Sequence, residues 1–220
     1  MSTRKITECA VVVLGRWNPA ILTPSGVAKM LFKLPEGTPI EIQIVIDDFQ
    51  PFRVRHDSLI VQVDHYRLSI LVEEFSTARL KRAMEVACEA MKSLPETPFS
   101  ACGVNFRYEI LDPESETLES LRSGLDNPVS DLEFEIAGRN CILTLKDEPG
   151  TMRFEVGLND KKLTALFNFH RESKKKEDLI AWLSRPVQEF EASVDRLCTK
   201  VLRVATKEVV DDVAGNGPSA

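Results

Sequence analysis

The stretch Cys102-Gly-Val-Asn-Phe-Arg-Tyr-Glu-Ile110 alternates apolar and polar side chains more regularly than any other part of the chain. Its apolar positions are Val104, Phe106 and Tyr108, and its polar positions are Asn105, Arg107 and Glu109. A period of two residues is typical of a β-strand with one face in a core and the other face in water. The stretch therefore predicts a strand of a half-buried sheet.

Similar strands are predicted upstream, joined by connections of a few residues. Residues 40–47, 59–63 and 68–72 alternate in the same way, and Arg55–Ser58 is expected to be a turn. Connections this short cannot hold a crossover helix, so neighbouring strands should run antiparallel. The valine-rich segment Cys9–Arg16 predicts a further, buried strand.

Three amphipathic helical segments are expected beside these strands. Thr23 can cap a short helix with Pro24 at its first position, and Ser76 can cap a second helix that extends to about Leu94. Near the C-terminal end, Ser184–Pro186 marks either a kink or a new helix start with Ser184 as its cap. An apolar stripe at helical spacing continues from there through Phe190, Val194, Leu197, Val201, Ala205 and Val209.

The second half of the chain follows the same design in outline. An acidic stretch, Asp112–Pro128, is expected to connect the halves and to contain a short helix at Thr117–Arg122. Turns are predicted at Gly138–Asn140 and Asp147–Gly150. Alternation predicts strands at 132–136, 141–145, 152–158 and 165–169.

Together these patterns predict an α+β fold, with mainly antiparallel sheet, amphipathic helices packed on one face and a long C-terminal helix. The expected divisions are residues 1–111 as a strand-helix-meander-helix-strand half, 112–128 as the acidic connector, 129–210 as a meander plus a long helix, and 211–220 as a disordered tail. Two arrangements remain open: a pseudo-repeat of two halves, and one continuous sheet shared by both.

Composition restricts the function classes. The 220 residues include 28 basic and 34 acidic side chains, a formal net charge of −6, which is unusual for a dedicated nucleic-acid binder. Neither a signal peptide nor an apolar run of membrane-spanning length is visible. The five cysteines are scattered, without the paired spacing of zinc ligands. We therefore expect reduced thiols, no metal site and a cytoplasmic location.

The sequence contains no phosphate-binding glycine loop, nucleophile elbow, H-E-x-x-H helix or kinase signature. No cofactor is therefore expected, and the sequence leans away from an enzyme. The candidates for a ligand or partner surface are single residues: Arg16, Trp17, His56, His65, Arg107 and His170.

Each candidate has a structural alternative. His56 and His65 flank one predicted strand and could converge with a carboxylate as a metal or acid–base pair, or both could face water in turns. Arg16 and Trp17 are residue types enriched in binding hot spots, but Trp17 could instead close the end of the core. His170 is expected at a strand end on the surface.

Three segments also resemble a known family. Cys102–Glu109, Leu166–His170 and the final helix with Phe190 and Val194–Leu197 are similar to segments of a sporadically distributed family of uncharacterised prokaryotic α+β proteins. The resemblance implies a bacterial or phage-borne cytosolic protein. It implies no particular activity and therefore no catalytic residues.

Three functional hypotheses follow. The first is a non-enzymatic protein-binding or assembly module that forms a homo-oligomer through the polar sheet face or the last helix. The second is an enzyme or small-ligand receptor with a pocket beneath the strand meander, using His56, His65 or Arg107. The third is a nucleic-acid-associated protein that uses Arg171 and Lys174–Lys176, which the acidic balance disfavours. No membrane association is expected.

Overall fold

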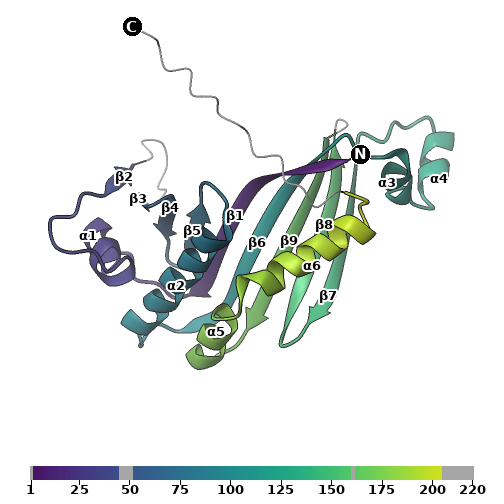
Figure 1. The fold of residues 1–220 in the computed structure, drawn as a ribbon. Helices are drawn as coiled ribbons and strands as arrows, with labels where there is room; N and C mark the ends of the chain where they lie inside the picture. The colour runs from purple at the N-terminus through teal and green to yellow at the C-terminus, as the bar shows by residue number, and fades with distance from the viewer. Residues whose placement is uncertain (1, 45–51, 160–161, 205–220) are drawn as a thin grey trace, which may run out of the picture.

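A computed structural model describes residues 2–44, 52–159 and 162–204 of the chain. These residues form one nine-stranded sheet in the order β2-β3-β4-β5-β1-β6-β9-β8-β7 (Figure 1). Every neighbouring pair is antiparallel, so the predicted α+β class with a mainly antiparallel sheet is confirmed. The strands are β1 (Thr3–Gly15), β2 (Glu41–Gln43), β3 (Arg53–His56), β4 (Leu59–Val63), β5 (Arg67–Val72), β6 (Phe99–Leu111), β7 (Gly138–Asp147), β8 (Gly150–Asn159) and β9 (Lys162–Glu172).

The central pair of the sheet is β1 and β6. Cys9 lies opposite Phe106, and Val11 lies opposite Val104, so the two strands present one continuous apolar row to the core. The strand predicted from Cys102–Ile110 is confirmed as β6. β1 begins at Thr3, six residues earlier than the valine-rich pattern predicts, because pairing with β6 extends the strand through residues that show no regular alternation.

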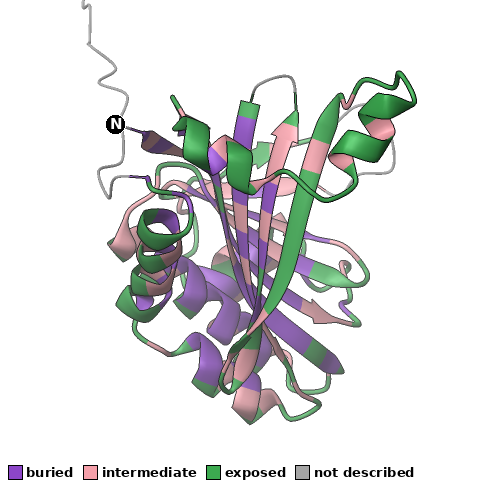
Figure 2. Ribbon diagram, turned by 90° about the vertical axis from the view of Figure 1, so that its right-hand side faces the viewer, coloured by how far each residue is buried: buried purple, intermediate pink, exposed green. Residues whose placement is uncertain are grey.

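Three helices cover one face of the sheet (Figures 1 and 2). α2 packs on β1 and β5, whereas α5 packs on β6 and β9 and also contacts α2. The Ser76 hydroxyl accepts a hydrogen bond from the Arg79 backbone N–H at 3.2 Å, so the predicted cap of α2 is confirmed. The helices are α1 (Pro24–Gly26), the π-helical turn η1 (Val27–Leu31), α2 (Thr77–Ser93), α3 (Ser115–Ser120), α4 (Asp126–Asp131), α5 (Lys176–Leu183) and α6 (Val187–Lys200).

The same order of elements occurs twice along the chain. β1 is followed by α1 and η1, a meander that ends in β5, and α2; β6 is followed by α3 and α4, a meander that ends in β9, and the helices α5 and α6. In the sheet, β5 lies beside β1 and β9 lies beside β6. Both runs therefore share one continuous sheet, and they meet at the β1–β6 pair.

Two expectations for the start of the second meander are wrong. Leu132 and Phe134 belong to no strand, and Gly138–Asn140 is the beginning of β7 rather than a turn. Gly138 lies opposite Asn159, the last residue of β8, so β8 offers no partner to the residues before Gly138. Alternating side chains do not form a strand without a neighbouring strand to hydrogen-bond.

The C-terminal segment divides into two helices at Pro186. Ser184 is not the cap of α6, because its hydroxyl donates to the Ile180 carbonyl at 2.8 Å; Pro186 occupies the cap position instead. The stripe residues Phe190 and Val194 are buried, as the spacing predicts. Ala205, Val209 and the predicted tail 211–220 lie outside the described residues.

The first meander differs from expectation at two places. In the predicted turn Arg55–Ser58, only Asp57 and Ser58 turn the chain, both with positive φ, because the first two residues complete β3. The strand predicted at 40–47 is described only as the short β2, since residues 45–47 lie outside the described part.

Candidate functional site

The two outer strands of the sheet differ greatly in length. β7 pairs with β8 through ten residues, from Gly138 to Asp147, without a bulge, whereas β2 at the other side has three residues. In the part of the chain that the structure describes, β7 has no neighbouring strand on its outer side. Its outward backbone N–H and C=O groups are therefore open to a further strand.

β7 also exposes apolar side chains on both of its faces. Ile142 and Leu143 point to opposite faces, and each is 47% exposed. Cys141 is the exposed cysteine, while the other four are buried. α5 packs on β6 and β9, two or more strands away, and Figure 2 accordingly shows an outer strand that is largely exposed. A long edge with exposed apolar residues is a site for pairing with another chain.

Ion pairs fix both ends of β7. The Arg139 guanidinium donates to Asp126 on α4 at 2.7 Å, and this contact holds the pKa of the Asp126 carboxyl below its usual value. At the other end, Arg185 lies 3.2 Å from Asp147 and also over the rings of Trp182 and Phe190. Between these charged ends, Asn140–Leu145 is uncharged.

A second concentration of polar residues lies at the end of the sheet from which α5 leaves. Three sequence candidates, Arg16, Trp17 and His65, are brought together there, and a fourth, His170, lines an adjoining hollow. The Trp17 backbone N–H donates to the His65 carbonyl at 3.0 Å, and Arg16 N–H donates to the Pro98 carbonyl at 3.1 Å. These bonds join the exit of β1 to the turn before β5 and to the entry of β6.

The side chains at this end have different roles. Trp17 is buried; its indole N–H donates to the Val13 carbonyl at 3.1 Å, and its ring lies 5.3 Å from that of Phe99. Trp17 thus closes the core, the structural alternative that the sequence left open. Arg16 and His65 are exposed, and the His170 ring lies 3.2 Å from the Glu172 carboxylate.

Two adjoining hollows occur at this end. One, of about 570 Å³, is lined by Arg16, Tyr66 and Lys174; the other, of about 290 Å³, is lined by Arg67, Asn105 and His170. Leu14 borders both hollows. Gly103 also lines the second hollow, and a Cβ at that position would lie 2.7 Å from the Phe169 carbonyl oxygen, so β6 and β9 approach closely there.

The two remaining sequence candidates, His56 and Arg107, lie elsewhere. His56 and His65 lie beyond opposite ends of β4, so they do not form the acid–base or metal pair that their spacing suggested. His56 packs against Phe32 with ring centres 5.3 Å apart. Arg107 forms an ion pair with Glu8 at 3.5 Å on the face of the sheet away from α2 and α5, which we call the open face. No group of three or more His, Cys, Asp or Glu side chains suited to a metal occurs among the described residues.

The basic run of the third hypothesis is divided by the fold. Arg171 donates to the Pro149 carbonyl in the β7–β8 turn, whereas Lys174 lines the larger hollow. Lys176 begins α5. Only Lys174 therefore joins Arg16 at the end of the sheet.

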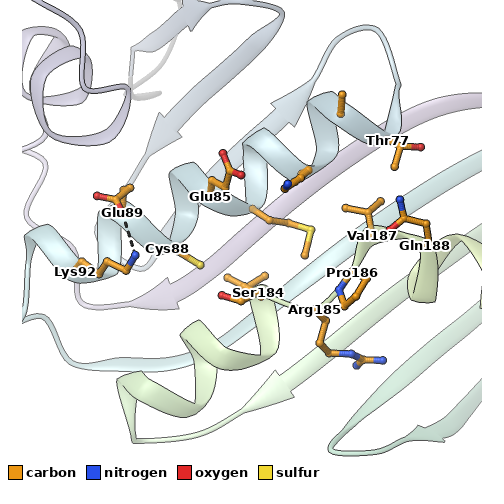
Figure 3. A pocket seen from close by; sticks show the side chains of 14 residues that line it. Thr77, Glu85, Cys88, Glu89, Lys92, Ser184, Arg185, Pro186, Val187 and Gln188 are labelled. Carbon is orange, nitrogen blue, oxygen red and sulfur yellow. Dashed lines mark hydrogen bonds and ion pairs between the residues drawn. The ribbon is translucent and has the colours of Figure 1, made fainter.

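A groove of about 790 Å³ separates α2 from the junction of α5 and α6 (Figure 3). Met84, Cys88, Leu183 and Val187 are its buried residues, while Lys92 and Glu89 form an ion pair at 3.0 Å on its rim. Burial raises the pKa of the Cys88 thiol, and burial raises that of Cys102 to about 12, so neither is a reactive thiolate at neutral pH. Glu85 and Arg185, two further charged residues of the groove, also have ion-pair partners within the chain, Arg82 and Asp147.

Sequence reasoning missed Tyr66, Arg67 and the edge of β7. Tyr66 and Arg67 follow His65 directly. An aromatic and a basic residue in the short connection between two predicted strands could have indicated a binding site. The edge of β7 had no sequence signal, because the order of strands in a sheet is not encoded by alternation. The other expected contact surface, the last helix, packs Phe190, Val194 and Cys198 into its own core.

No described helix combines the length and apolar character needed to cross a membrane. Comparisons of the chain with protein-family models, with curated proteins and with solved structures found no match.

Proposed function

We propose that this protein is a non-enzymatic assembly module that forms a homodimer by pairing β7 with β7 of a second copy. The single observation that carries the proposal is the ten-residue open edge with Ile142 and Leu143 exposed on its two faces. Pairing would satisfy the outward backbone groups and cover both side chains. A two-fold axis perpendicular to the sheet would join two nine-stranded sheets into one.

The pleat of the strand restricts the register. Successive side chains point to opposite faces, and residues directly opposed in antiparallel strands point to the same face. With the helices of both copies on one side, odd-numbered residues of β7 must therefore oppose odd-numbered residues. In each allowed register, one residue of β7 lies on the two-fold axis, opposite its own copy. That residue is Leu143 in one register and Ile142 in the next.

Charge favours the register with Leu143 on the two-fold axis. It places Arg139 opposite Asp147 at both ends of the paired strands. Arg139 already contacts Asp126, and Asp147 already contacts Arg185. Each end of the paired strands would therefore hold a row of four alternating charges: Asp126, Arg139, the partner's Asp147 and the partner's Arg185. The register with Ile142 on the axis places Arg139 opposite Leu145 and gives Asp147 no new cation.

Apolar contacts favour the same register. Leu143 would meet its own copy and Cys141 would meet Leu145, on the face that α5 and α6 only partly cover. Exposed Leu132 and Phe134 precede β7 in the chain, on the side where the partner's β7–β8 turn would lie. These residues add area to the strand pairing, and stable dimers need at least ~1,200 Å² in total.

Light scattering after size exclusion tests the proposal with two matched variants. Leu143→Lys places two cations opposite each other on the axis and should shift the protein from twice the monomer mass to the monomer mass, with at least a ~10-fold weaker dimer. Ile42→Lys adds the same charge at nearly the same exposure, 45%, on the other outer strand and should leave the dimer intact. Thermal melts of both variants check that they fold.

Mixing opposite charges tests the register. Leu143→Lys and Leu143→Glu should each be monomeric alone and should form a heterodimer when mixed, because the two side chains meet only when residue 143 lies on the axis. A wild-type chain that stays monomeric at ~100 µM, some 100-fold above a micromolar dissociation constant, would contradict the dimer. If Ile42→Lys rather than Leu143→Lys disrupts the dimer, the contact between the two copies lies at β2.

A further inference from the structure

We propose that the end of the sheet around Arg16, Tyr66, Arg67 and Lys174 binds the phosphate group and the base of a nucleotide, either free or within single-stranded nucleic acid. This site is separate from the β7 edge and goes beyond the assembly function. The four residues come from the exit of β1, the turn before β5, the first position of β5 and the loop after β9, and they line the two adjoining hollows. Tyr66, Arg67 and Lys174 lie 50 to 158 residues after Arg16 in the chain, so only the sheet makes them neighbours.

The site carries three basic side chains, those of Arg16, Arg67 and Lys174. Arg55, Arg107 and Arg153 on the open face each have a carboxylate within 3.5 Å. Within the described residues, Arg16, Arg67 and Lys174 form no ion pair, although acidic residues outnumber basic ones in the chain. Three unpaired cations around two adjoining hollows are suited to a doubly charged phosphate group.

The acidic residues beside these cations in the chain are already engaged. The Asp64 carboxylate accepts hydrogen bonds from the backbone N–H groups of Tyr66 and Arg67, both at 2.7 Å. The Glu172 carboxylate lies 3.2 Å from the His170 ring. An incoming anion would therefore meet the guanidinium and ammonium groups without displacing a carboxylate from them.

An aromatic ring lies beside these basic side chains and could stack on the base of a nucleotide. Tyr66 is 74% exposed, and it lines the larger hollow together with Leu14, Pro98 and Phe99. An exposed aromatic ring beside apolar side chains and cations is the arrangement on which proteins stack single nucleobases. A carboxylate ligand would use the cations but would leave the ring of Tyr66 without a partner.

Hydrogen bonds fix the backbone segments that carry these side chains before any ligand arrives. Gly15 N–H donates to the Tyr66 carbonyl at 3.1 Å, Ser173 N–H donates to the Ser100 carbonyl at 3.1 Å, and Lys175 N–H donates to the Ser173 hydroxyl at 3.0 Å. The turn before β5 and the loop after β9 are thus both attached to the central strands. A site ordered in advance loses less entropy on binding.

Fluorescence anisotropy with labelled ATP and with a labelled thymidine oligonucleotide of about twelve residues tests the proposal at ~50 mM salt. Saturable binding is expected for at least one probe. The logarithm of the binding constant should fall with the logarithm of the salt concentration with a slope near −2, as about three phosphate contacts would give. Stronger binding of the oligonucleotide by ~100-fold would identify nucleic acid as the source, and similar binding of both probes would identify the free nucleotide.

Matched variants locate the site. Arg67→Gln and Arg16→Gln should each weaken binding at least ~5-fold and reduce the salt slope by ~0.7, whereas Arg153→Gln, on the same sheet face but paired with Glu155, should change neither. Tyr66→Ala should weaken binding at least ~5-fold, and Tyr66→Phe should not. The proposal is overturned if neither probe binds, or if Arg67→Gln and Arg153→Gln have equal effects.

Discussion

The two meanders of the sheet, β3–β5 and β7–β9, occupy equivalent places beside the central pair but differ in how they are covered. The strands of the first have four to six residues, and those of the second have ten or eleven. In the first, η1 contacts α2, and Phe32 just after η1 packs against His56 of β3. In the second, the corresponding helices α3 and α4 lie at the end of the sheet, and the outer strand stays exposed (Figure 1).

The comparison shows how helix placement decides where a sheet stays open. Arg82 on α2 donates to the Phe32 carbonyl at 3.1 Å, which ties the segment after η1 to the helix layer. The buried hydroxyl of Thr117 on α3 instead donates to the Leu202 carbonyl at 2.9 Å, at the end of α6. Thus α3 fixes the C-terminal segment and α4 holds only the Arg139 end of β7, while the middle of β7 stays exposed.

The largest effect is expected in the core between α6 and the second meander. Phe190 is fully buried, and its ring lies 5.1 Å from Phe169 and 5.4 Å from Trp182. Phe190→Ala should lower the free energy of unfolding by ~3–5 kcal/mol, measured by urea denaturation. Phe134→Ala, at a residue 67% exposed beside β7, should change it by less than ~0.5 kcal/mol. A large loss at Phe134 would mean that the segment before β7 is packed.

A smaller effect is expected at the β7–β8 turn. A Cβ on Gly150 would clash with the His170 carbonyl oxygen and would lie 3.3 Å from the indole nitrogen of Trp182. Gly150→Ala should therefore lower the free energy of unfolding by ~1–3 kcal/mol. Gly124→Ala, where no atom lies within 4 Å of the added methyl, is the control and should be close to neutral. Equal effects at the two glycines would show that the turn is not held against the sheet.

The smallest effect is expected for the polar link between β7 and β8. Asn140 donates to the Glu155 carboxylate at 2.8 Å, and this bond, followed by the contact with Arg153, lowers the pKa of Glu155 from 4.5. Because the folded pKa is the lower one, the link stabilises the protein fully above pH 4.5 and is lost as pH falls through the folded pKa. Glu155→Gln should therefore cost well under ~1 kcal/mol at neutral pH, and the cost should shrink as the pH falls through the folded pKa of Glu155, measured by thermal melts across a pH series. A cost that grew on acidification would contradict the assignment.

The agreement between sequence and structure depends on how local the signal is. β6 and α2 were predicted because alternation and capping act within a few residues, and both are found nearly where the pattern places them. The strand predicted at 132–136 fails for the opposite reason, since a strand needs a partner and β8 ends at the residue opposite Gly138. The alternative in which His56 and His65 form a pair fails because they lie at opposite ends of one strand.

The sequence by itself determined which residues alternate, where α2 begins, and that short connections produce an antiparallel sheet covered by helices on one face. Those properties depend on neighbouring residues, which the chain specifies directly. Only the tertiary structure decided that β7 is an outer strand, that Arg16, Tyr66 and Lys174 line one hollow, and that Arg67 lines the adjoining one. Strand order and side-chain convergence depend on contacts between distant segments, and no local pattern carries that information.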